Sequence, residues 1–148
     1  MKVHGREYEI VVSVQKTFRG SHSLPARPEL HGHLWEVEFS VSGPLDPSTG
    51  MVCDMLVLSD FFGPYTRELD NGNLHELPMF QQADELVSLT AKYPTCDTLA
   101  HYFLWRITPD FEKDPRFSRL RLCEITVCIW EENKSRRWGR ASIRPRGT

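Results

Sequence analysis

The chain has 148 residues, a length that suits one domain, and its 40% hydrophobic and 26% charged residues are typical of a globular protein. The 18 Lys and Arg and the 20 Asp and Glu give a formal net charge of −2, which excludes a protein held on nucleic acid by overall charge alone. From Lys134 onward there are six basic residues and no acidic one. We therefore expect a single domain over residues 1–148, with a basic C-terminal extension from about 134 and no nucleic-acid partner.

No apolar run approaches the ~20 residues of a membrane-spanning helix, and the N-terminal segment lacks the apolar stretch of a signal peptide. The four cysteines form no close pair of the zinc-binding kind. Cys123 and Cys128 lie in an apolar segment and are expected to be buried free thiols, as in a reducing compartment. We therefore expect a cytoplasmic protein with no membrane partner.

Alternating apolar residues predict two β-strands in the first third of the chain, over 8–18 and 33–42. Two prolines mark the stretch 20–29 between them as a loop, so we expect an antiparallel pair with a wide connection. Helical spacing follows over 55–69, where Gly63-Pro64 is expected to break or kink the helix.

A turn over 70–73 and a short helix over 81–90 are expected next, before a longer helix over 95–107. Alternation returns over 121–130, and the segment 138–143 is expected to pair with that strand as a hairpin. The order β-β-α-α-β-β predicts an α+β domain whose four strands and two helices leave one sheet face without cover. Oligomerisation would cover that face.

Three histidines form the sharpest chemical feature of the sequence. His31 and His33 flank Gly32, so strand alternation places both imidazoles on one side with no bulk between them. His22, at the far end of the preceding loop, is the candidate third ligand. Three nitrogen ligands with an open fourth position suit catalytic zinc, which polarises a bound oxygen. Spacing alone leaves a second interpretation open, a surface histidine pair without a function.

Six short segments, in order along residues 8–132, resemble motifs of the 6-pyruvoyl-tetrahydropterin synthase and 6-carboxy-tetrahydropterin synthase family. They are Phe18 to His22, His31-Gly32-His33, Gly50-Met51-Val52 with Asp54, Leu69-Asp70, Pro94-Thr95 with Asp97 and Ala100, and Trp130-Glu131. The resemblance implies a tunnelling fold, in which an antiparallel four-stranded sheet carries two helices on one face and copies of the chain assemble into a barrel. Members of the family form two stacked trimers with sites between subunits and act on dihydroneopterin triphosphate.

Carried over by position, the resemblance makes His22, His31 and His33 ligands of Zn²⁺. It makes Glu131 the anchor of the pterin, since a carboxylate accepts two parallel N–H bonds from the amino-pyrimidine edge. Thr95 and Asp97 match the pocket segment at a helix start, although the family prefers Glu at the position of Asp97. The alternative for Glu131 is a solvated strand end.

The resemblance breaks at the residues that move protons in this family, a cysteine shortly before the HGH motif and an Asp-His pair. No cysteine lies between His22 and His31, and Arg27 stands where the bacterial carboxy-pterin enzymes place theirs. The usual Leu-Asp-His reads Leu69-Asp70-Asn71, and asparagine cannot titrate near neutral pH. The family reaction is therefore expected to be absent or severely slowed unless other groups replace these two.

Several residues are candidates for the missing roles. Asp70 remains from the catalytic pair, Glu29 is a candidate general base shortly before the HGH motif, and His75 is a candidate relay, unless it is an exposed loop histidine. Cys96 either faces a ligand or is a small buried thiol. Arg27 does not deprotonate, so its candidate role is to bind a carboxylate or phosphate of the substrate; the alternative is a solvated loop arginine.

We thus expect a zinc-dependent lyase or cyclase of the pterin-synthase type, with altered chemistry, that acts on a pterin or a related small molecule bearing a carbonyl or hydroxyl group. Two alternatives stay open. One is a non-catalytic protein that binds a pterin-like ligand or partners an active paralogue. The other is an ordinary 6-pyruvoyl or 6-carboxy synthase that uses Glu29 or His75. The expected partners are a small-molecule substrate and further copies of the chain in a trimer or hexamer.

Overall fold

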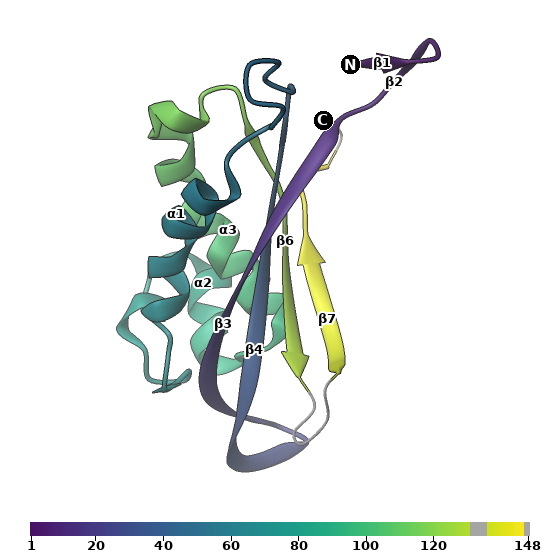
Figure 1. Cartoon of the computed structure of the whole chain (residues 1–148). Coiled ribbons are helices and arrows are strands. Elements are labelled where there is room, and N and C mark those ends of the chain that lie inside the picture. Colours follow the sequence, from purple (N-terminus) through teal and green to yellow (C-terminus); the bar gives the residue numbers. More distant parts are fainter. Residues whose placement is uncertain (131–135, 147–148) are drawn as a thin grey trace.

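A five-stranded sheet, covered on one face by three α-helices, forms the body of the computed structural model, which describes residues 1–130 and 136–146 (Figure 1). The order of strands across the sheet is β5-β3-β4-β6-β7. Its strands are β3 (Ile10–Leu24), β4 (Arg27–Gly43), β5 (Gly72–Asn73), β6 (Arg121–Trp130) and β7 (Arg137–Ile143). The helices are α1 (Met55–Arg67), α2 (Glu85–Lys92) and α3 (Cys96–Lys113), and a small hairpin, β1 (Lys2–Val3) with β2 (Arg6–Glu7), precedes the sheet.

The α+β class and the antiparallel central strands are confirmed, but the counts expected from the sequence are too low. The described part of the chain has three α-helices, because the short helix expected over 81–90 forms as α2 in addition to the two that were counted, and β5 adds a fifth strand that pairs in parallel with β3 over only two residues. No described helix is long and apolar enough to cross a membrane.

The loop expected over 20–29 is wrong, because both strands continue through it. β3 and β4 pair without interruption from Ile10 opposite Gly43 to His22 opposite His31, and a single register shift precedes the turn that joins Leu24 to Arg27. Figure 1 shows this long hairpin reaching past the helices at its turn. The prolines that suggested a wide loop lie at and just after the tight turn, where a missing backbone N–H costs little.

The two faces of the sheet differ in chemistry. On the helix side, alternate residues of β4 are fully buried, and the Phe39 ring stacks on Phe62 of α1 with centroids 4.3 Å apart. On the other side, hydroxyls meet in pairs: the side-chain oxygens of Ser13 and Ser40 lie 2.7 Å apart. The buried Glu36 carboxylate accepts from Arg137 Nε at 2.7 Å, which ties β7 to β4 across β6.

Helix ends follow the local sequence, and two prolines are absorbed within helices. The Asp54 side chain caps α1, which runs without a break through Pro64, contrary to the expected interruption. Thr95 caps α3 in a reciprocal arrangement with Thr98, and this helix continues beyond Pro109 to Lys113. Burial of the apolar stripes of both helices against the sheet outweighs the cost of the prolines.

A β-bulge interrupts the pairing of β6 with β7. Ile129 lies opposite Gly139 and Trp130 lies opposite Arg137, which leaves Trp138 without a partner residue in the ladder. The Trp138 side chain is 72% exposed. The bulge therefore presents a large aromatic ring at the end of the sheet where the β3–β4 turn also lies.

Candidate metal centre

Three imidazoles meet on the helix-side face of the β3–β4 hairpin. His22 and His31 are direct partners across the two strands, and His33 follows two residues later on the same side of β4. Their ring centroids are 4.6 to 5.0 Å apart, and one ligand nitrogen from each lies within 4.8 Å of the others. Strand register, rather than a folded-back loop, thus brings the three sequence-predicted ligands together.

Hydrogen bonds fix which nitrogen of two of these rings is free. Nδ1 of His22 donates to the Pro94 carbonyl at 2.6 Å, and Nδ1 of His31 donates to the Glu29 carbonyl at 3.0 Å. A carbonyl only accepts, so the neutral form of each ring carries its free lone pair on Nε2. His22 Nε2 is buried without a hydrogen-bond partner among the described residues. A buried acceptor aimed at two further imidazoles fits a metal ion, and carbonyl-bound imidazoles are the usual arrangement around one.

The surroundings also favour the neutral form of His22 and His33. Burial, with the neighbouring His31 adding to it, lowers the pKa of His22, although the Pro94 hydrogen bond opposes the shift. Burial and the two other imidazoles lower the pKa of His33 to about 4. At neutral pH both rings are therefore deprotonated, which is the state that binds metal.

Trp35 supports the cluster from the core side. Its side chain is fully buried, its Nε1 donates to the Gly20 carbonyl at 3.0 Å, and its ring stacks on Phe18. The ring centroid lies 5.1 Å from that of His22 and 5.8 Å from that of His33. Gly20 also lets the buried Leu74 side chain pack closely on β3, because a Cβ at position 20 would come within 3.1 Å of it.

A cavity of about 320 Å³ opens over the three imidazoles. Besides the histidines its lining consists of one cation and four apolar or aromatic side chains: Arg27, Leu24, Ile129, Trp130 and Trp138. The sequence alone predicts the histidines and Arg27 as site residues but not the apolar wall. That wall depends on the pairing of β6 with β4 and on the bulge in β7, and neither is visible in a local pattern.

Arg27 and Glu29 stand next to the cluster on the same strand. The Arg27 Nε lies 3.3 Å from a Glu29 carboxylate oxygen, and both side chains are more than half exposed. A hydrogen bond from its own backbone N–H, helped by the Arg27 guanidinium, lowers the pKa of Glu29, so this carboxylate is ionised at neutral pH. Glu29 does not line the cavity, whereas Arg27 does.

Asp70 and Asn71 form a turn that holds the edge of β3. The Asp70 carboxylate accepts from the Arg19 backbone N–H at 2.8 Å, and Asn71 N–H donates to the Arg19 carbonyl at 2.6 Å. Asn71 has a φ of 60°, a left-handed conformation that asparagine tolerates better than most residues. Asn71 and His33 both line a second hollow of about 230 Å³, so the turn adjoins the candidate metal centre.

His75 uses both ring nitrogens in contacts within the fold. Its Nε2 accepts from the Ser23 backbone N–H at 2.9 Å, and its Nδ1 donates to the Ala91 carbonyl at 2.8 Å. A relay role would require the ring to release one of these bonds, which connect β3 to the end of α2.

The other expected pocket residues lie around the start of α3. The Thr95 hydroxyl caps the helix, Asp97 is exposed in its first turn, and the preceding Pro94 carbonyl is the partner of His22. Burial, with a smaller contribution from the Cys128 thiol, raises the pKa of Cys96 to about 12, which argues against a reactive thiolate. Glu131 lies outside the described residues.

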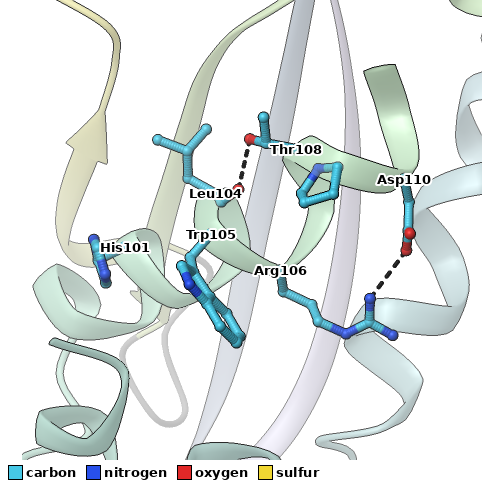
Figure 2. A pocket seen from close by; sticks show the side chains of 7 residues that line it. His101, Leu104, Trp105, Arg106, Thr108 and Asp110 are labelled. Atoms are coloured by element: carbon cyan, nitrogen blue, oxygen red, sulfur yellow. Dashed lines mark hydrogen bonds and ion pairs between the residues drawn. The ribbon is translucent and has the colours of Figure 1, made fainter. Parts of the chain in front are cut away.

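A larger hollow, of about 630 Å³, lies on α3 away from the histidines. Figure 2 shows that its lining comes from successive turns of this one helix. Its charged groups already pair with each other, Arg106 Nη1 donating to an Asp110 carboxylate oxygen at 2.9 Å. The histidine cavity, where three imidazoles offer ligand nitrogens within 4.8 Å of one another, is therefore the better candidate site.

Comparison with known proteins identifies the family and the fold of the chain. A family model described as 6-pyruvoyl tetrahydropterin synthase matches residues 11–135. Among solved structures, the chain is similar to the 6-pyruvoyl tetrahydropterin synthase of Caenorhabditis elegans, with a TM-score of 0.65, 17% identity, and coverage of 95% of this chain and 98% of that one. The Plasmodium falciparum enzyme gives a TM-score of 0.60 and 19% identity over 94% of this chain and all of that one.

The Plasmodium vivax enzyme is similar as well, with a TM-score of 0.62 and 17% identity, over 94% of this chain and 100% of that one. A second structure of that enzyme, with a TM-score of 0.59 and 16% identity over the same shares, is described as a mutant in which a catalytic glutamate is replaced by alanine. These matches confirm the tunnelling fold expected from the motifs. Because the family model covers most of its length, the chain belongs to the 6-pyruvoyl tetrahydropterin synthase family.

Proposed function

We propose that this protein is a zinc-dependent enzyme of the pterin-synthase type, a lyase, whose proton-transfer groups differ from those of the family. The observation that carries the proposal is the buried, unpartnered Nε2 of His22 beside His31 and His33, in a chain of this family. Zinc is the metal we propose, because three histidine ligands with an open position are a typical catalytic zinc set. The substrate is a pterin, or a related small molecule with a hydroxyl or carbonyl group.

The proposed roles follow from the positions of the histidines and Asp70 and, for Glu131, Thr95 and Asp97, from the family motifs that they match. The three histidines hold the ion, which when bound acidifies or polarises an oxygen of the substrate side chain. The carboxylate of Glu131 grips the amino-pyrimidine edge of the substrate, and Thr95 and Asp97 shape the pocket beside Pro94. Asp70 keeps the turn next to His33 in place.

Glu29 is the proposed general base. Its carboxylate is ionised at neutral pH and exposed, two residues from His31 on the same side of β4. A catalytic glutamate in the Plasmodium vivax enzyme shows that carboxylates serve within this family. His75 is the weaker candidate, since both of its nitrogens are occupied.

The test is incubation of the zinc-loaded protein with dihydroneopterin triphosphate, followed by analysis of the products. We expect the protein to turn over this substrate and His31→Ala to abolish the turnover. Glu29→Gln should lower the turnover rate by at least 10²-fold, the usual contribution of a general base. The control is Glu38→Gln, on the same strand but hydrogen bonded to Gln15. Absence of stoichiometric zinc, or full activity of His31→Ala, would contradict the proposal.

A non-catalytic, pterin-binding role is the second candidate, and Asn71 favours it, because this residue stands where the family has its relay histidine. Tight binding of a pterin without turnover over hours would support this role. In either case we propose that the protein is cytoplasmic. We also propose that it is a homo-oligomer, a trimer or hexamer, because β7 has a strand neighbour on one side only among the described residues. Sedimentation of the purified protein measures the oligomeric state.

A further inference from the structure

The histidine cavity has a floor and a wall of different character. The floor consists of the three imidazoles on β3 and β4, whereas the wall consists of Leu24, Ile129, Trp130 and Trp138, with Arg27 at the turn. No acidic side chain is among the described residues that line it. An apolar, aromatic wall with one permanently charged cation suits a ligand that is mostly flat and apolar but carries negative charge.

Trp138 is the unusual member of the wall. Its ring is 72% exposed although it lines a cavity, and the bulge leaves it unpaired in the ladder. A large exposed ring has surface left to bury, and an indole face is a good stacking surface for a planar ring system. A planar ligand over the imidazoles would cover part of this ring.

Arg27 is held only weakly by its neighbour. Its ion pair with Glu29 joins two side chains that are 59% and 63% exposed, and such surface pairs contribute little free energy. The planar guanidinium forms two parallel hydrogen bonds to a carboxylate or phosphate. An anionic group that enters the cavity can therefore take the place of Glu29 at low cost.

We propose that Arg27 and Trp138 together select the ligand of this cavity: a planar ring that stacks on Trp138 and carries a carboxylate or phosphate that pairs with Arg27. The inference rests on the proposed function for the site but names a feature of its substrate that the metal set alone does not give. Arg27 is then a specificity residue at the position where relatives place a proton-moving cysteine.

The experiment measures binding to the zinc-loaded protein by calorimetry. Three bicyclic probes share one ring system, namely 2-naphthoate, 2-naphthyl phosphate and the neutral 2-naphthamide, and unsubstituted pterin is titrated separately. We expect at least one anionic probe to bind about tenfold or more tightly than the amide. Arg27→Gln should reduce that preference to within about twofold, and Trp138→Ala should weaken all three probes about tenfold, a typical effect of losing one stacked ring.

Each substitution has a matched control elsewhere on the surface, because Arg27 and Trp138 are both exposed. Arg144→Gln removes another exposed cation, and Trp105→Ala removes a partly exposed ring on α3; neither residue lines the cavity, and neither change should alter probe binding. The two anionic probes distinguish a carboxylate ligand from a phosphate ligand.

The outcomes separate this inference from the proposed function. A preference for anions that survives Arg27→Gln belongs to the metal and would overturn the inference, as would equal binding of all three probes or no binding of any. Discrimination that depends on Arg27, without binding of pterin, would support the inference and count against a pterin substrate. Binding of pterin with no effect of either substitution would leave the proposed function standing and refute the inference.

Discussion

Trp35→Phe is expected to loosen the candidate metal centre without touching a ligand. The substitution removes the Nε1 donor to the Gly20 carbonyl and empties part of a fully buried site next to the rings of His22 and His33. Both effects act on the segment of hairpin that holds two of the three imidazoles in register.

The magnitude follows from these two losses. The buried hydrogen bond contributes about 1 kcal/mol, and the space left by the smaller ring costs about 1–2 kcal/mol, so the free energy of unfolding of the zinc-free protein should fall by about 2–3 kcal/mol. Loss of supporting contacts around metal ligands typically costs 10- to 100-fold in affinity, and we expect zinc binding to weaken by about that factor.

Urea unfolding of the zinc-free protein gives the first quantity, and competition with a chromophoric chelator gives the second. The matched control is Phe39→Leu, on the same strand, where a fully buried ring stacks on Phe62 rather than on the histidines. It should destabilise the protein comparably and leave zinc affinity unchanged. If Trp35→Phe weakens zinc binding no more than Phe39→Leu does, the supporting role of Trp35 is refuted.

Three further predictions concern the same region. The pKa of His33 is about 4 in the folded chain against 6.5 unfolded, so between these two pH values the unfolded chain binds more protons than the folded chain. The free energy of unfolding of the zinc-free protein should therefore fall by about 1–2 kcal/mol as the pH is lowered through this range. Urea midpoints measured across this range should depend less on pH in His33→Gln. Gly20→Ala should lower the free energy of unfolding, measured in urea, by about 1–3 kcal/mol, because the added Cβ meets the buried Leu74 side chain. An unchanged stability would show that β3 or Leu74 moves at no cost to accept the methyl group. His75→Phe should lower the free energy of unfolding by about 1–3 kcal/mol, because it removes both hydrogen bonds of the ring, and should leave turnover per folded molecule unchanged. If a folded His75→Phe variant has no turnover, His75 is the proton relay.

The sequence was a good guide to the floor of the site. Period-two spacing put His31 and His33 on one side of a strand, and the structure has them there, with His22 directly opposite His31. Helix positions were found because the apolar stripes of α1 and α3 are strong. The expected bounds of 55–69 lie within two residues of those of α1, although the break expected at Pro64 is absent. The expected end of α3 at 107 is too early, because Pro109 is tolerated once tertiary packing supports the helix.

The hairpin connection and the cavity wall could not be found in the same way. Two prolines near residue 25 are typical of a loop, and only pairing along the full length of β3 and β4 shows that the strands continue to a tight turn. Trp138 has no local signal for its role, since its place depends on a bulge opposite Trp130. The role of Glu131 stays a prediction.

The β-bulge has a consequence for how this site can diversify. The metal set lies on β3 and β4, whereas Ile129, Trp130 and Trp138 belong to the second hairpin, β6 with β7. A residue gained or lost at the bulge would change the direction of the Trp138 side chain while leaving every imidazole in register. The stacking surface for the ligand therefore lies on a different hairpin from the metal set and Arg27, and it can change while the geometry of the metal set is preserved.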